Sequence, residues 1–65
     1  MIDSNICAIL RVEKARLNIT QKKMAKLIGT NLDAYQDAEE IGRLRGKSGQ
    51  KIIKYVESLR NRLIS

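Results

Sequence analysis

Among the ionisable side chains of this sequence, the cationic ones are the most numerous. The 65 residues contain 13 lysines and arginines against 7 aspartates and glutamates, which gives a formal charge of +6 and a pI near 9.9. A small domain with this charge favours an anionic partner, either a nucleic acid or an acidic membrane surface, although the charge also serves simply to keep a protein soluble. A glycine-rich loop over residues 42–49 carries Arg43, Arg45 and Lys47, and its open backbone N–H groups add to the capacity for phosphate contact.

The residue types that catalysis and metal binding need are scarce. There is no histidine and a single cysteine, Cys7, so neither a metal-ligand set nor a Ser-His-Asp arrangement can be assembled. Cys7 lies in an apolar run, which predicts a buried small hydrophobe, and a lone cysteine fits a reducing cytosol. No apolar stretch approaches the ~20 residues of a membrane span, and the first residues do not make a signal peptide. We therefore expect a cytoplasmic protein that is not an enzyme and uses no cofactor or metal.

Charge is divided unevenly along the chain. Residues 30–42 hold Asp33, Asp37, Glu39 and Glu40 and no cation, whereas residues 11–26 and 43–62 hold all 13 basic residues. An acidic segment inside a basic chain is the least expected feature of this composition. It must be explained by any function that is proposed for the protein.

The elements that position these groups are predicted to be helices. The chain has no proline and few glycines, and it is rich in Leu, Ile, Lys, Arg and Glu, which favours an all-α fold. Over residues 20–40, Thr20 suits the N-cap of a short helix that Gly29 ends, and Asn31 is placed to cap a second one. A helix, a short turn and another helix are the parts of a helix-turn-helix.

Two further helices flank this unit, and together they predict one domain over residues 1–65. The first runs from Ser4 or Asn5 to Leu17, and the last from about Gly49 to Leu63, with Ser48 as its cap. The apolar stripe of the last helix has two interpretations. Either it closes the core of the monomer, or some of its side chains meet a second copy of the chain, namely Tyr55, Leu59, Leu63 and Ile64.

The centre of the chain resembles a known family. Residues 10–29, LRVEKARLNITQKKMAKLIG, look like the start of the lambda repressor/Cro-type helix-turn-helix domains, also called the XRE family. The matching residues are Leu10, Arg11, Lys14, Ile19, Thr20, Gln21, Met24, Ala25 and Gly29. The resemblance covers residues 10–42 well and the last helix loosely. It implies a compact lambda repressor-like domain of four or five helices, and a Cro-like phage or plasmid repressor that occupies an operator on double-stranded DNA as a homodimer.

The resemblance also implies roles for individual residues. Lys14 and Glu39 would form an ion pair between the first and third helices, unless they remain two separately solvated charges. Base readout would come from Gln21, Leu32, Asp33, Gln36 and Asp37. Phosphate contacts would come from Lys22, Lys23, Lys26, Thr30, Asn31, Arg43, Arg45 and Lys47.

The two aspartates do not fit the usual recognition helix, which presents Gln, Ser, Thr, Asn or Arg. They indicate a preference for cytosine, whose N4 amino group aspartate can accept from, or a third helix that meets a basic protein surface. Asp33 also simply suits the positive end of a helix dipole. The alternative function is therefore a protein-interaction module of the same fold, such as an anti-repressor or an inhibitor. A membrane surface suits the chain least, because its cations are spread over several elements.

Overall fold

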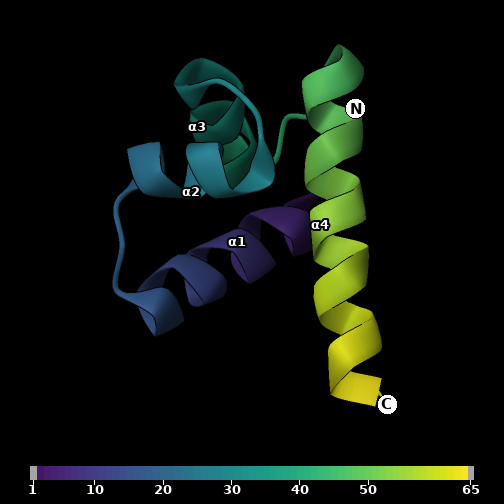
Figure 1. Cartoon of the computed structure of the whole chain (residues 1–65). Coiled ribbons are helices and arrows are strands. Elements are labelled where there is room, and N and C mark those ends of the chain that lie inside the picture. The colour runs from purple at the N-terminus through teal and green to yellow at the C-terminus, as the bar shows by residue number, and fades with distance from the viewer. Residues whose placement is uncertain (1, 65) are drawn as a thin grey trace.

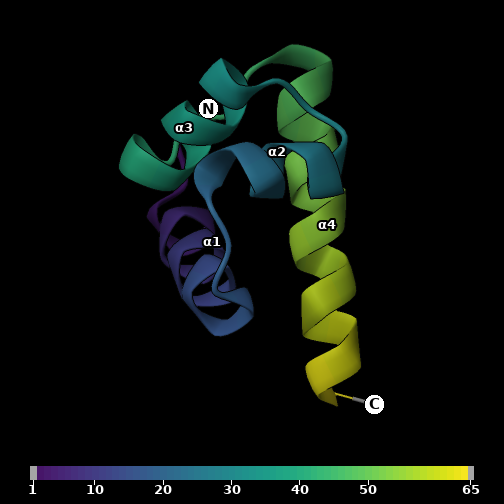
Figure 2. The same ribbon diagram turned by 60° about the vertical axis from the view of Figure 1, so that its left-hand side comes forward.

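Four helices form the structure, a computed structural model that describes residues 2–64 and the side chains of residues 2–62. They are α1 (Ser4–Leu17), α2 (Gln21–Ile28), α3 (Leu32–Ile41) and α4 (Gly46–Ile64), and there is no strand among residues 2–64. The predicted all-α fold is thus confirmed, with four helices rather than five. Helices α1, α2 and α3 pack together, and α4 stands beside them with its C-terminal end projecting beyond the other three (Figures 1 and 2).

Local signals place the ends of the first three helices. Side-chain oxygens accept hydrogen bonds from backbone N–H groups at their N-termini, and these caps are Asp3, Thr20 and Asn31. At their C-termini the backbone turns into the left-handed conformation, at Asn18, Gly29 and Gly42. The two short helices α2 and α3 are therefore separated only by residues 29–31, as predicted.

Helix α4 begins at Gly46, and the prediction that it starts at Gly49 with Ser48 as its cap is wrong. Gly49 already lies inside the helix, where its N–H group donates to the carbonyl of Arg45 at 2.8 Å. Leu44 is buried just before the helix, and a Cβ on Gly49 would lie only 3.0 Å from the Leu44 backbone. Glycine is used here for this close contact and not for a flexible loop, so the predicted loop is reduced to residues 42–45.

All four helices contribute to the core. The largest fully buried side chains are Leu10 of α1, Met24 of α2, Tyr35 of α3, and Ile52 and Val56 of α4. Because each helix supplies at least one of them, none can detach without exposing apolar surface. None of the helices in the described part of the chain is long and apolar enough to cross a membrane.

Gly42 and Gly29 end helices in the same conformation but differ in their surroundings. Gly42 (φ +73°) lies against the N-terminal segment, and a Cβ there would come within 2.5 Å of the Asp3 carbonyl oxygen, whereas a Cβ at Gly29 (φ +90°) would meet nothing within 4 Å. We expect Gly29→Ala to lower the free energy of unfolding by about 1–2 kcal/mol, the usual cost of left-handed backbone. Gly42→Ala should cost clearly more, because the Asp3 backbone must also move. Urea denaturation measures both losses, and equal losses would contradict the close approach.

Candidate nucleic-acid interface

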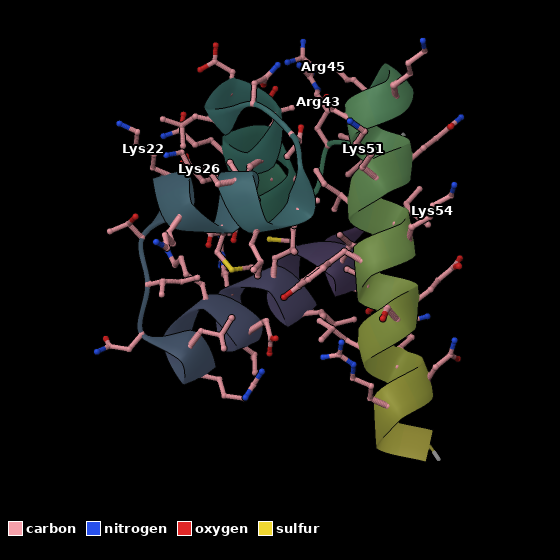
Figure 3. All side chains as sticks on the ribbon, in the orientation of Figure 1. Lys22, Lys26, Arg43, Arg45, Lys51 and Lys54 are labelled. Atoms are coloured by element: carbon pink, nitrogen blue, oxygen red, sulfur yellow. The ribbon has the colours of Figure 1, made fainter. Side chains whose placement is uncertain are left out.

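Exposed cations lie along α2, in the connection between α3 and α4, and on the N-terminal half of α4, where Lys51 points towards α2 and α3 and Lys54 points away from them (Figure 3). They come from three parts of the chain: from α2, from the connection between α3 and α4, and from α4 itself. We term this set the cationic end, and its members are Lys22, Lys26, Arg43, Arg45, Lys51 and Lys54. The C-terminal half of α4 projects away from this end (Figure 1). A polyanion that approached α2 and α3 would therefore meet cations from three elements at once.

Lys51 and Lys54 are candidate phosphate contacts that sequence reasoning missed. Together with Lys47 they follow a spacing of i, i+4 and i+7, which places all three on one side of α4. This spacing is visible in the sequence, but it indicates one side of a helix only when the helix includes Lys47, which the predicted loop over residues 42–49 excludes. Lys51 also donates from Nζ to the Gly29 carbonyl at 3.0 Å, so its ammonium lies at the turn between α2 and α3.

Arg45 and Asp37 were predicted to contact a phosphate and a base separately, but the structure brings them together. An Arg45 guanidinium nitrogen lies 2.8 Å from a carboxylate oxygen of Asp37. Both side chains remain partly exposed, at 59% and 34%, so the pair is accessible to a competing anion. This ion pair neutralises part of the negative charge of residues 30–42.

The two polar residues at the turn before α3 differ in their surroundings. The hydroxyl of Thr30 is buried and has no hydrogen-bond partner among the described residues. Asn31 accepts from the Ala34 N–H group at 2.8 Å and so caps α3. In this conformation the Thr30 hydroxyl is not available to a phosphate, and only the amide nitrogen of Asn31 is left for that purpose.

A buried carboxylate connects α1, α2 and α3. Glu39 is 3% exposed, accepts a hydrogen bond from the Tyr35 hydroxyl at 2.9 Å and another from the amide of Gln21, and lies 3.1 Å from the Lys14 ammonium. The ion pair that the resemblance implied is therefore present. Burial by itself raises the pKa of Glu39, but the hydrogen bonds from Gln21, Lys14 and Tyr35 outweigh it and hold this pKa below its usual value. Burial and the nearby carboxylate raise the pKa of Tyr35, so its hydroxyl stays a donor.

Of the five residues predicted to read bases, Asp37 is paired with Arg45, and the other four fall into two groups. Leu32 and Asp33 are exposed in the first turn of α3, where Asp33 also suits the helix dipole. Gln36 and Gln21 are half-buried and bonded to each other, because Gln36 donates from Nε2 to Oε1 of Gln21 at 3.1 Å. Gln21, at the start of α2, is therefore hydrogen-bonded to a residue of α3.

Helix α1 holds the C-terminal end of α3. Arg11 donates from Nε to the Glu39 carbonyl and from Nη2 to the Glu40 carbonyl, each at 3.1 Å. Cys7 is half-buried rather than fully buried as predicted, and its thiol donates to the same Glu39 carbonyl at 2.7 Å. These contacts satisfy carbonyls that a helix end leaves free, and they fix the position of α3 on α1.

A groove separates α1 from the C-terminal half of α4. It has a volume of about 660 Å³, and Val12, which sequence reasoning did not single out, is 68% exposed there. Its lining residues are Ala8, Ile9, Val12, Glu13, Arg16, Leu59 and Arg62.

The residues predicted to meet a second copy are divided by the structure. Leu59 lines the groove. Tyr55 instead packs against the core and donates to Glu13 at 3.3 Å, which corrects the expectation that it is left over. Leu63 and Ile64 lie outside the residues whose side chains are described.

The fold and the site define a small, basic, all-α domain with cations arranged around two short consecutive helices. Comparison of the chain with protein-family models, curated proteins and solved structures gives no match. Among the described residues, no three His, Cys, Asp or Glu side chains are grouped so that they could hold a metal ion.

Proposed function

We propose that the chain is a small sequence-specific DNA-binding transcriptional regulator, in which α2, the turn and α3 act as a helix-turn-helix. The observation that carries this proposal is that Lys22, Lys26, Arg43, Arg45 and Lys51 bring exposed cations from three elements to the end of the molecule that holds α2 and α3 (Figure 3). Lys51, bonded to the carbonyl of Gly29 in the turn itself, adds a positive charge where α3 begins. Phosphate contacts on both sides of α3 would hold this helix in a major groove.

The acidic residues of α3 are less of an obstacle than the sequence suggests. Asp37 is paired with Arg45, and Glu39 is buried in its own network of donors. Asp33 and Glu40 are the exposed carboxylates of this helix, and that of Glu40 accepts a hydrogen bond from Gln21 at 3.3 Å. The repulsion between α3 and a duplex is therefore weaker than four carboxylates would produce.

Operator occupancy by a dimer completes the proposal. The groove between α1 and α4 is lined in part by the apolar side chains of Val12 and Leu59, and a second copy of the chain would pack against them. Two copies related by a two-fold axis would place one α3 in each of two major grooves about one helical turn apart. Such a dimer would act in the cytoplasm as a Cro-like repressor, by excluding polymerase from a promoter.

A protein-interaction module is the second candidate, and one observation favours it. The exposed residues of α3 include Asp33 and Glu40 together with apolar Ile41, which is 53% exposed. A face that combines carboxylates with an exposed apolar side chain suits a basic protein surface better than a polyanion. An anti-repressor or an inhibitor of a DNA-binding protein would use such a face.

Titration of a mixed-sequence duplex at increasing salt tests the proposal. If the six cations of the cationic end neutralise phosphates, we expect the affinity to fall roughly a thousandfold between 50 and 200 mM salt. Absence of duplex binding at low salt would instead favour the protein-interaction module. Selection from randomised duplex then tests the dimer, because a dimer should recover two half-sites related by two-fold symmetry.

A further inference from the structure

We propose that the groove between α1 and the C-terminal half of α4 binds a small amphipathic anion, of the class of a medium-chain fatty acid, and that this ligand competes with the second copy of the chain. The inference rests on the proposed function, because it names a means of regulating the proposed dimer. It depends on the size of the groove, on its apolar side chains and on the charges beside them.

The apolar side chains of the groove come from both helices. Ala8, Ile9 and Val12 lie on α1, and Leu59 lies on α4. Val12 is 68% exposed, so an apolar ligand in the groove would remove it from water. The volume of about 660 Å³ lies within the range of roughly 300–1,000 Å³ that is usual for small-molecule sites. An acyl chain in the groove would therefore contact apolar side chains of both helices.

The charged residues of the groove are two arginines and one glutamate. Glu13 is 7% exposed, and its two carboxylate oxygens accept from Arg16 at 2.7 and 2.8 Å, while the Tyr55 hydroxyl donates to it at 3.3 Å. Arg16, and to a lesser extent Arg62, hold the pKa of Glu13 below its usual value, so this carboxyl group is ionised at neutral pH. Two guanidinium groups therefore stand against one carboxylate. A carboxylate head group suits this excess of positive charge better than a neutral or cationic one.

A second copy of the chain matches these charges less well than an anion does. In a two-fold dimer the same surface of each copy meets, so two arginines and one glutamate from each side would be brought together. Each copy also carries a formal charge of +6, and the two copies repel each other. An amphipathic anion covers the same apolar side chains, Val12 and Leu59, and brings the opposite charge. It should therefore displace a second copy that is held mainly by apolar contacts.

Titration of the isotope-labelled full chain with decanoate, below its micelle concentration, tests the site. Decanoate should shift the backbone amide signals of Val12 and Leu59 and leave that of Leu27 unchanged. Decyltrimethylammonium has the same chain length and the opposite charge, and it should bind roughly tenfold more weakly or not at all. This comparison of two ligands needs no variant, so it does not depend on whether a variant folds.

Two pairs of variants locate the binding site. Val12→Asp should weaken decanoate binding by roughly tenfold or more, because it removes an apolar contact and adds a carboxylate. Leu27→Asp is its control, since Leu27 is 55% exposed but lies on α2 and does not line the groove. Arg62→Glu should weaken binding roughly tenfold, whereas Arg60→Glu changes the charge equally at an exposed position that does not line the groove, and should weaken it by less than about threefold.

Analytical ultracentrifugation of the wild type with and without decanoate tests the competition. At ten times its own dissociation constant, decanoate should raise the apparent dissociation constant of the dimer about a hundredfold, because each of the two released copies binds one ligand. Decyltrimethylammonium at the same concentration should leave the dimer unchanged.

The outcomes separate this inference from the proposed function. Equal binding of the two ligands, equal losses in Arg62→Glu and Arg60→Glu, or decanoate shifts confined to the cationic end overturn the anion site and leave DNA binding in place. Binding in the groove with an unchanged dimer overturns the competition. A wild type that is monomeric without ligand overturns the dimer and the competition with it. Absence of duplex binding at low salt overturns the proposed function, while the titration still decides whether the groove binds decanoate.

Discussion

The double variant Lys22→Glu/Lys26→Glu is expected to lose all measurable binding to duplex DNA at salt concentrations at which the wild type binds. Both side chains are exposed and lie one helical turn apart on α2. Each substitution removes a phosphate contact and introduces a negative charge in its place. Two lost contacts and two new repulsions should lower the affinity by roughly three orders of magnitude or more at low salt. Fluorescence anisotropy with a labelled duplex measures the loss.

Arg60→Glu provides a matched control for the single variant Lys26→Glu. Lys26→Glu and Arg60→Glu change the net charge by the same amount, and both sites are exposed, but Arg60 lies in the projecting half of α4. We expect a large loss of affinity for Lys26→Glu and a loss of less than about threefold for Arg60→Glu. Equal losses would mean that net charge alone drives binding, which would contradict an interface at the cationic end. Thermal unfolding should be nearly unchanged in both, as is usual for exposed sites.

The parts of the fold that sequence predicted correctly depend on neighbouring residues. Thr20, Gly29 and Asn31 place the ends of α2 and the start of α3 because a cap or a left-handed turn acts within about four residues. The start of α4 was misplaced for the opposite reason. Gly49 lies inside the helix, close to the backbone of buried Leu44, and the glycine itself contains no sign of that contact.

The candidate site was predicted by residue type but not by pairing. Lysines and arginines near α2 and α3 follow from the sequence alone, whereas the pairs Arg45–Asp37 and Lys51–Gly29 depend on how the connection after α3 and helix α4 are oriented relative to α2 and α3. The pairing of Lys14 with Glu39 was implied by the family resemblance and is present. Spacing alone could not have shown it, since the two residues lie on different helices.

Removing the carboxylate of Glu39 is expected to destabilise the fold strongly. Glu39→Ala leaves the buried Tyr35 hydroxyl without its acceptor and removes one of the two carboxylates that accept from the Gln21 amide, while Lys14, whose side chain is 30% exposed, can turn to water. We therefore expect the loss in unfolding free energy to lie below that of a fully buried ion pair, at about 2–4 kcal/mol. In a domain of this size that lowers Tm by roughly 10 °C or more. Circular dichroism during heating or urea denaturation measures it, with exposed Glu40→Ala as the control expected to change little.

The pH dependence of this loss identifies its cause. The pKa of Glu39 is lower in the folded state than its ordinary value of 4.5, so its stabilising contribution is present above that value and is lost as the pH falls through the folded pKa. The difference in unfolding free energy between the wild type and Glu39→Ala should therefore be constant near neutral pH and shrink on acidification below about 4.5. Glu13, whose pKa the Arg16 guanidinium also lowers, titrates in both proteins and does not affect this difference. A difference that stays constant into acid would show that Glu39 stabilises the fold by packing rather than as a charged acceptor.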